Sequence, residues 1–377
     1  MRVVKLFTRS GPLLTLVVVV VVIAWGLGFG GLVGALLGLL LELVAFQVGT
    51  LLGALLWRLR VRHVVFGVGR ELRAWTSPKL RIVLCAIPVV LLVGVRSIHP
   101  PVRRRLWLAG LTSVACGGAA VAVAWLPADG DLSRGLAVGA TVCLLHQLQP
   151  RREAGVTSPG WYLFKLPRLT GRAAAEMDAT PLVNDVVDAV REGDLDAADV
   201  ALAKLVEEHP TLLMTAGAQA TVLSARARYA EALHHISTLV GRTDLEPRDM
   251  AFVMAEMANA TTSAVEANQL PADIGVPAAT RSADAAIQFG FPRTRLAGTL
   301  AQLALVNGDH AKALELARQS ADGSEGGLAR ADSLATLARA HMAAGDNASA
   351  RVVLAEAEEL AAWLPRVKET AARLRIS

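Results

Sequence analysis

Glu42 is the residue whose type and surroundings most strongly suggest chemistry. It lies in the stretch LLLELVAF, residues 39–46, in which every other side chain is apolar. A carboxylate in such a stretch would stand at the depth of the lipid hydrocarbon, where charge is costly and usually kept for function. The first question is therefore whether Glu42 has partners with which it could act as a base or bind a metal.

Two candidate partners, Cys143 and His146, lie one helical turn apart in a later apolar run. His146 is about 12 residues into that run and Glu42 about 11 into its own, so at roughly 1.5 Å per residue they lie at a similar depth. The three side chains would make a ligand set that leaves a fourth zinc position open for water. The simpler alternatives are a Glu42–His146 hydrogen bond between helices, or a protonated Glu42 bonded to backbone. We expect a structural polar contact and no metal.

Four apolar runs would position these residues: 12–29, 31–57, 105–126 and the shorter 134–149. Their lengths are close to or above the roughly 20 residues that a helix needs to cross a bilayer, except for the shorter fourth run. The apolar content of the chain, 53%, is also too high for an ordinary soluble protein. The first run follows Arg2, Lys5 and Arg9, as in a signal peptide. It has no A-x-A cleavage site and apolar sequence resumes at once, so we expect a retained anchor over residues 1–30.

The distribution of charge predicts the topology, because Lys and Arg stay on the cytoplasmic side. The connection 127–133 carries Asp129 and Asp131, whereas the segment between the second and third runs is basic. We therefore expect a multi-pass protein of the cell membrane whose N-terminus, basic segment and chain after Arg151 are cytoplasmic. Contact with anionic lipid headgroups accounts for the basic residues, so we expect the bilayer as a partner and no nucleic acid. These residues are Arg58, Arg60, Arg62, Arg70, Arg73, Lys79, Arg81, Arg96, Arg103, Arg104 and Arg105.

Residues 80–95, LRIVLCAIPVVLLVGV, are apolar but flanked by Lys79, Arg81 and Arg96. A crossing would place these charges on opposite sides of the membrane. The segment is also rich in β-branched residues, which favour strands. We expect a re-entrant or interfacial β segment near 61–95, packed against the helices.

Four stretches in this order resemble the site-2-protease-like intramembrane metallopeptidases. The first is the acidic residue in the apolar run 31–57, and the second is FGVGREL, residues 66–72, which is similar to that family's G-x-G-P-x-L segment. The third, RRRLWLAGLTSVACGGAAVA at 103–122, is similar to the A-G-P-x-x-N helix. The fourth, TSPGWYLFKL at 157–166, is similar to the segment that supplies the third metal ligand. The resemblance covers residues 31–168.

The resemblance implies a zinc site that this chain has lost. In the family, H-E-x-x-H places two imidazoles beside a glutamate base; aligned on Glu42, those positions hold Leu41 and Ala45. The third-ligand position holds Pro159, the substrate-orienting Asn falls at Val114, and the Pro of A-G-P at Leu111. Only the base remains, which indicates a pseudoprotease with Glu42 as a remnant. Zinc would be present only if Glu42, Cys143 and His146 formed an atypical site.

A second region, from residue 176 on, is rich in Ala, Leu, Asp and Glu with helical periodicity. A register recurs there and resembles tetratricopeptide repeats, with Gly193 and Ala227 34 residues apart, and Gly308 and Gly345 37 apart. A small residue closes the turn between two helices, and a second small residue lets them pack closely. The signature positions are Gly193, Ala198, Tyr229, Ala232, Gly308, Ala313, Gly345 and Ala350.

Between the second and third registers we expect degenerate helices and a loop at 271–278, and at the C-terminus a basic capping helix over 366–377. Such arrays stack into a solenoid whose concave face commonly binds peptides or partner helices. The alternative is a bundle of helical hairpins without a ligand.

The predicted fold is thus all-α: about four membrane helices, with the β or re-entrant segment near 61–95, followed by a soluble α-solenoid. The predicted domains are an anchor at 1–30, a degenerate protease-like membrane domain at 31–168 and a cytoplasmic repeat domain at 176–377. We expect a non-catalytic scaffold that binds a membrane partner and recruits an unidentified cytoplasmic protein through its repeats, with no cofactor. The alternatives are an active zinc metallopeptidase with atypical ligands, and a repeat adaptor with a mere membrane anchor.

Overall fold

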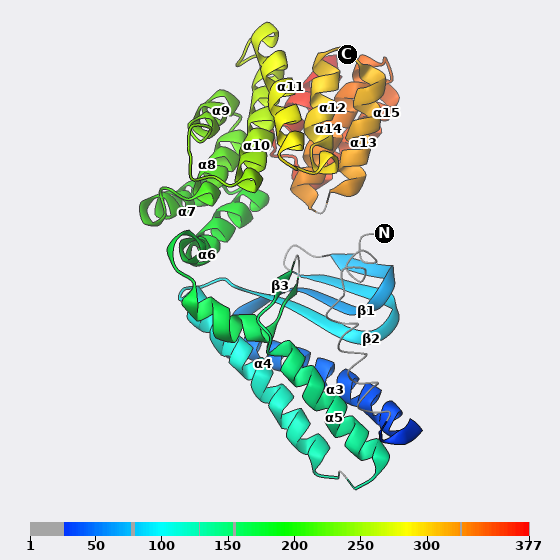
Figure 1. The fold of residues 1–377 in the computed structure, drawn as a ribbon. Coiled ribbons are helices and arrows are strands. Elements are labelled where there is room, and N and C mark those ends of the chain that lie inside the picture. The colour runs from blue at the N-terminus through cyan, green and yellow to red at the C-terminus, as the bar shows by residue number, and fades with distance from the viewer. Residues whose placement is uncertain (1–25, 77–79, 128, 154–155, 325, 377) are drawn as a thin grey trace. The chain divides into compact units, whose positions relative to one another are not determined.

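The computed structural model describes residues 26–76, 80–127, 129–153, 156–324 and 326–376. The chain is mostly helical and divides into two compact units, Met1–Pro181 and Leu182–Ser377, here called the N-terminal and C-terminal units (Figure 1). A single helix, α6 (Gly171–Glu192), runs across the division, and Pro181 lies within it. The predicted anchor at 1–30 falls almost wholly outside the described residues.

Three helices form one layer of the N-terminal unit: α3 (Gly28–Leu56), α4 (Val102–Trp125) and α5 (Asp131–Gln147). Among the described residues, α3 and α4 are long and apolar enough to cross a bilayer, and they match the predicted runs 31–57 and 105–126. Helix α5 matches the predicted run 134–149 but has only 17 residues, below the roughly 20 that a crossing needs. The structure thus supports two of the four predicted spans.

Helices α3 and α5 pack backbone against backbone. A Cβ atom on Gly34 or Gly38 would overlap the carbonyl oxygen of Leu132 or Leu136. Added to Gly135 or Gly139, it would overlap Gly31 or Ala35 in the same way. Small residues four apart permit such close approach of apolar helices. Without glycine on both helices this interface would not form.

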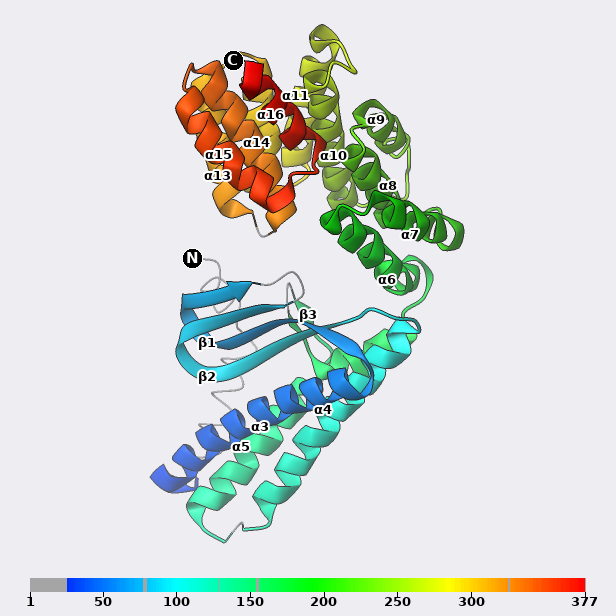
Figure 2. The same ribbon diagram turned by 180° about the vertical axis from the view of Figure 1, so that it is seen from behind.

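The second layer is a sheet of two long antiparallel strands, β1 (Leu59–Thr76) and β2 (Arg81–Ser97). Residues 63–66 have one set of partners at 81–84 and another at 91–94, because both strands bend and fold back. Figure 2 shows the resulting layer beside the three helices. The expectation of a β segment near 61–95 is confirmed. That this segment does not cross the bilayer stays a prediction.

The polypeptide reaches α6 through a short hairpin, β3 (Arg152–Glu153) with β4 (Val156–Thr157), and two short helices. These are the π-helix η1 (Trp161–Lys165) and the 3₁₀ helix η2 (Leu166–Arg168). Trp161 and Leu166 are buried in a core with Leu106 and Ala109 of α4. The C-terminal part of the predicted protease-like region is therefore packed on the start of α4.

The C-terminal unit consists of antiparallel helices joined by short turns. In chain order these are α7 (Leu195–Glu208), α8 (Leu213–Ala225), α9 (Tyr229–Ser237), α10 (Pro247–Glu266), α11 (Ala272–Gln288), α12 (Ala297–Val306), α13 (His310–Gly323), α14 (Gly327–Ala343), α15 (Asn347–Ala361) and α16 (Pro365–Ile376). A 3₁₀ turn, η3 (Arg293–Arg295), precedes α12. Successive helices pack side by side along the array (Figure 1).

Five turns between paired helices share one geometry. Each contains a residue with positive φ: Gly193, Ala227, Asn268, Gly308 or Gly345. The N–H group of the next residue bonds to the carbonyl five positions back, for example Asp194 to Ala189 and Asp309 to Ala304. This is the hydrogen-bond pattern of a Schellman helix end. The turn at Asn268 shows that the region between the second and third registers holds a further helix pair, as expected.

The predicted loop at 271–278 is wrong, because residues 272–278 belong to α11, with Pro277 inside the helix. Pro271 stands at the N-cap, where its lack of an N–H group costs nothing. Gly275 brings α11 against α10, since a Cβ atom there would overlap the side chain of Val265. Helix packing thus outweighs the local preference of two prolines for a loop.

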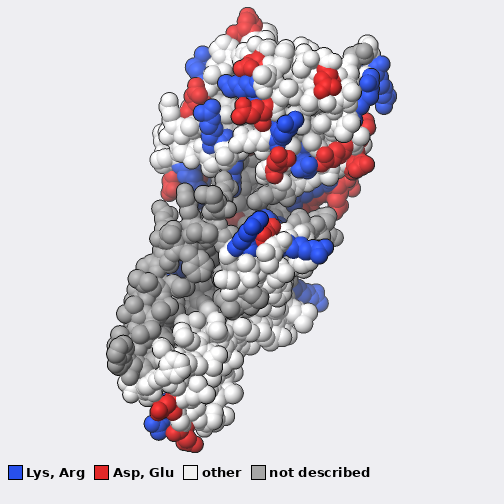
Figure 3. Space-filling view, turned by 90° about the vertical axis from the view of Figure 1, so that its right-hand side faces the viewer, with Lys and Arg blue, Asp and Glu red and all other residues white. Residues whose placement is uncertain are grey.

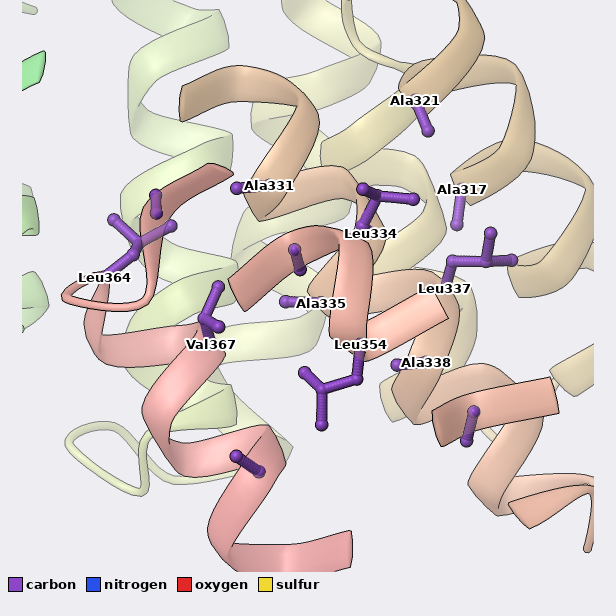
Figure 4. Packing of buried hydrophobic residues seen from close by; sticks show 14 of the residues in the cluster. Ala317, Ala321, Ala331, Leu334, Ala335, Leu337, Ala338, Leu354, Leu364 and Val367 are labelled. Atoms are coloured by element: carbon purple, nitrogen blue, oxygen red, sulfur yellow. The ribbon is translucent and has the colours of Figure 1, made fainter. Parts of the chain in front are cut away.

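The core of the C-terminal unit is built largely from alanine. One cluster joins Ala317 and Ala321 of α13, Ala331, Ala335 and Ala338 of α14, and Ala357 of α15, with Leu334, Leu337, Leu354 and Val367 between them (Figure 4). Alanine allows neighbouring helices to approach closely, and the larger leucine and valine side chains fill the remaining space. The stacking of small residues that the register predicts is therefore the physical basis of this unit.

Candidate functional site

Glu42 lies on the face of α3 that packs against α4. Its side chain is completely buried, and neither carboxylate oxygen has a hydrogen-bond partner within the described residues. Opposite it, α4 carries Gly117, where a Cβ atom would overlap Oε1 of Glu42. Phe46, one turn later on α3, is also buried and packs at the same place. An apolar ring and a bare backbone thus enclose the carboxylate.

The expected polar contact between Glu42 and His146 is not formed. Cys143 is fully buried on α5 and near enough to interact with the charge of Glu42. His146 faces a different environment, in which Arg151 is its charged neighbour, and its carbonyl oxygen accepts a hydrogen bond from Arg151 at 2.8 Å. The expectation failed because equal depth along two helices does not determine which way each side chain points.

Zinc does not fit the site around Glu42. No three His, Cys, Asp or Glu side chains in the described part of the chain are grouped so that they could hold a metal ion. The positions that the resemblance assigns to ligands hold Leu41, which is 42% exposed on the outer face of α3, Ala45, and Pro159. A carboxylate and a neighbouring thiol do not supply the three ligands of a catalytic zinc.

A cavity of about 300 Å³ lies in the same unit, and Glu42 does not line it. Its walls are formed by α3, the two strands, the start of α4 and the chain around Tyr162. Gln47 fixes one wall, since its Oε1 atom accepts a hydrogen bond from the backbone N–H of Val93 at 2.9 Å. In a second wall, Thr50 Oγ1 lies 3.2 Å from Ser113 Oγ, which donates to the carbonyl oxygen of Phe46. The sequence reasoning missed this cavity.

The cavity is basic on one side. Arg62 and His63 of β1 and Arg96 of β2 line it, and none of the described residues that line it is Asp or Glu. The imidazole of His63 occupies the space that a side chain on Gly94 would need. Burial lowers the pKa of His63, and the positive charges of Arg62 and Arg81 lower it further. Burial and the positive charges around it therefore favour the neutral form of His63.

In the C-terminal unit, the predicted signature positions are structural. Gly193, Gly308 and Gly345 occupy the positive-φ turns. Ala198, Ala232, Ala313 and Ala350 are completely buried between helices, and Tyr229 is nearly so. These residues therefore shape the turns and the close helix packing of the array.

A buried ionic cluster, which the sequence reasoning also missed, joins four helices of this unit. Glu266 of α10 pairs with Arg339 of α14 and Arg366 of α16, and the side chains of all three are less than a tenth exposed. Arg366 also donates to Asp332 at 2.6 Å and to Thr336 at 2.9 Å. The amide oxygen of Gln302 of α12 accepts from it when the amide is turned so that this oxygen faces the guanidinium. Arg339 reaches Glu369 and Thr370.

The charges in this cluster hold each other in the ionised state. Burial alone would raise the pKa of Glu266, but Arg366 and Arg339 outweigh it, so that the pKa lies below its usual range. Because every charged group has an opposite partner, the cluster fits a structural role and not a ligand site. In the sequence, Arg366 is one of several basic residues in the last helix, so nothing near it along the chain predicts that it is buried.

A comparison of the chain with protein-family models found no match, and a search of curated proteins found none either.

Proposed function

We propose that the chain is a non-catalytic membrane scaffold: its N-terminal unit binds a membrane partner, and its C-terminal helical array recruits a cytoplasmic protein. The observation that carries the proposal is the enclosure of Glu42. A general base must reach the proton that it abstracts, directly or through one water. Glu42 is fully buried against Phe46 and Gly117, outside the cavity of its own unit, so it is not placed to activate water.

Membrane insertion is the second part of the proposal. Helices α3 and α4 are long and apolar enough to cross a bilayer, and α3 exposes large apolar side chains such as Leu37, Val48 and Leu55. In Figure 3 the described surface of the helical end of this unit is almost entirely uncharged, except at its tip. The connection between α4 and α5, which carries Asp129 and Asp131, would lie outside, whereas the basic segment and the C-terminal unit would be cytoplasmic.

The four-span arrangement, with the run 12–29 and the short α5 as further crossings, belongs to this proposal. Its support is the close packing of α5 on α3, because a helix whose backbone touches that of an apolar helix shares its surroundings. The degenerate site-2-protease-like core and the tetratricopeptide-like array are likewise proposed identities. The first is supported by the order of the four stretches between residues 31 and 168, and the second by the five Schellman turns.

Affinity capture from native membranes tests the scaffold. We would compare the full chain, a chain that ends at residue 170, and a chain whose N-terminal unit is replaced by an unrelated membrane anchor. The first should capture a membrane and a cytoplasmic protein, the second only the membrane protein, and the third only the cytoplasmic one. If the third captured both, the N-terminal unit would be only an anchor and the adaptor alternative would be correct.

Glu42→Gln provides the control for catalysis. An amide keeps the size of the side chain, so capture of both partners should be unchanged. Stoichiometric zinc in the purified chain, lost in Glu42→Gln or His146→Ala, would instead establish the metallopeptidase alternative.

A further inference from the structure

The basic cavity of the N-terminal unit combines two chemically different walls. The strand wall carries the basic residues Arg62, His63 and Arg96 beside Leu92, Val93 and Val95, and the α4 wall carries Leu106, Ala109 and Gly110. Gly110 is needed for this shape, because a Cβ atom on it would lie 2.7 Å from Cβ of Tyr162. A ligand that fits such a space carries negative charge at one end and hydrocarbon at the other.

The positive wall has capacity to bind an anion. The side chain of Arg62 is exposed, and neither an ion pair nor a hydrogen bond of Arg62 is formed within the described residues. Arginine binds phosphate through two parallel N–H groups, which makes it well suited to phosphate esters. Near it, Gln47 uses its Oε1 atom for Val93, which leaves the amide nitrogen of Gln47 available as a donor.

The cavity lies at one end of the apolar helices. Gln47 and Thr50 are in the last three turns of α3, and Leu106 to Ser113 are in the first half of α4. The basic segment of β1 and β2 joins these two ends. In the proposed topology this is the cytoplasmic end, where phosphates of anionic lipids lie and where basic pockets between membrane helices bind headgroups.

We propose that this cavity binds the phosphate ester of an anionic membrane lipid, with the phosphate at Arg62, His63 and Arg96 and the acyl-glycerol portion along Leu106, Ala109 and Gly110. The inference rests on the proposed membrane insertion but not on any protein partner. Free phosphate could bind the same basic residues. The apolar wall favours a lipid, because only a lipid has hydrocarbon to place against it.

Lipid titration of the purified full chain in neutral detergent tests this site. The thermal midpoint and the lipid retained in native mass spectrometry would be followed with phosphatidylglycerol, phosphatidylcholine and inorganic phosphate. Phosphatidylglycerol should raise the midpoint and remain bound at about one molecule per chain, and the other two should do neither. Equal stabilisation by phosphatidylcholine, or full stabilisation by inorganic phosphate at millimolar concentration, would overturn the lipid assignment.

Arg62→Gln should weaken phosphatidylglycerol binding about tenfold, and Arg62→Lys should retain part of it. The matched control is Arg70→Gln, which removes the same charge from an exposed position on β1 outside the cavity and should bind as the unchanged chain does. Equal binding by Arg62→Gln and the unchanged chain would refute the site. Because Arg62 is exposed, its replacement should leave the fold intact, which the midpoint without lipid verifies. Lipid binding without capture of protein partners would contradict only the scaffold proposal. Capture of protein partners without lipid binding would contradict only the lipid site.

Discussion

Gly117 of α4 and Glu42 of α3 meet so closely that no side chain fits at position 117. A Cβ atom there would overlap Oε1 of Glu42 and lie 3.1 Å from the ring of Phe46. The carboxylate and the glycine thus depend on each other: the glycine provides the space, and the carboxylate fills it without a hydrogen bond from the described residues.

Gly117→Ala should therefore destabilise the N-terminal unit by about 1–3 kcal/mol, as overpacking of a closed interface does. The control is Gly118→Ala on the same helix, where a Cβ atom would have no neighbour within 4 Å; it should be neutral or slightly stabilising. The measurement is the thermal midpoint of each variant in detergent. Adding Glu42→Ala to Gly117→Ala should recover part of the loss, and equal midpoints for the two glycine variants would contradict the contact.

Gln269 supplies a helix cap that the local sequence lacks. Asp194, Asp309 and Asp346 cap α7, α13 and α15 with their own side chains. The corresponding residue before α9 is Arg228, and Gln269 of the next turn reaches back instead. Its Oε1 atom accepts from Ala230 N–H at 3.0 Å, and its Nε2 group donates to the carbonyl oxygen of Ala227 at 2.5 Å.

Gln269→Ala should cost about 1–2 kcal/mol, the usual effect of removing a cap. Arg228 has backbone angles close to those of the three capping aspartates. Arg228→Asp should therefore restore stability in the Gln269→Ala background and add little in the unchanged chain. Urea unfolding of the four chains forms a double-mutant cycle, and additive effects would show that the two residues do not cap the same helix.

Glu266 makes the stability of the C-terminal unit sensitive to acid. Glu266→Ala would leave Arg339 and Arg366 buried without their shared partner, at a cost of about 3–5 kcal/mol. Because the pKa of Glu266 is lowered in the folded chain, its contribution is present above pH 4.5 and is lost as the pH falls through the lower folded value. Chemical unfolding measures the free energy of unfolding of the unchanged chain and of Glu266→Ala. The two values should differ strongly at pH 7 and less at pH 3. Glu231→Gln, at an exposed ion pair, is the control and should change little.

Glu256 has the opposite dependence. Burial on α10 raises its pKa to about 7, so its neutral form is favoured in the folded chain. The contribution of protonated Glu256 to the stability of the fold is fully present below pH 4.5 and is lost as the pH rises through about 7. Glu256→Gln should stabilise the chain at pH 8 by up to about 3 kcal/mol and leave it unchanged at pH 4.5. Glu207→Gln, at an exposed position on α7, should have no effect at either pH.

The sequence predicts those features that depend on periodicity. The apolar runs at 31–57 and 105–126 became α3 and α4, and the registers at 193, 227, 308 and 345 became Schellman turns. The turn at Asn268 lacks the Gly or Ala that marks the register, although asparagine also adopts the left-handed conformation. The loop at 271–278 was wrong because tertiary packing at Gly275 is invisible to local propensity.

The site could not be predicted in the same way. Whether Glu42 meets His146 depends on the rotation of α3 and α5, which the glycine contacts determine and which depth alone does not. The basic cavity needs residues from β1, β2, α3 and α4 to meet, and no spacing along the chain reveals this. Arg366 is buried because it lies opposite Glu266, one hundred residues away.

The glycine contact between α3 and α5 limits how this unit can move. Since a single methyl group would already collide with Leu132, Leu136, Gly31 or Ala35, the two helices cannot slide or rotate past one another by a small step. They should behave as one rigid body. Helix α4 is held against α3 in the same way, because a Cβ atom on Gly49 or Gly53 would collide with the Cα atom of Ser113 or Ala109. The three helices should therefore move together and keep water from Glu42.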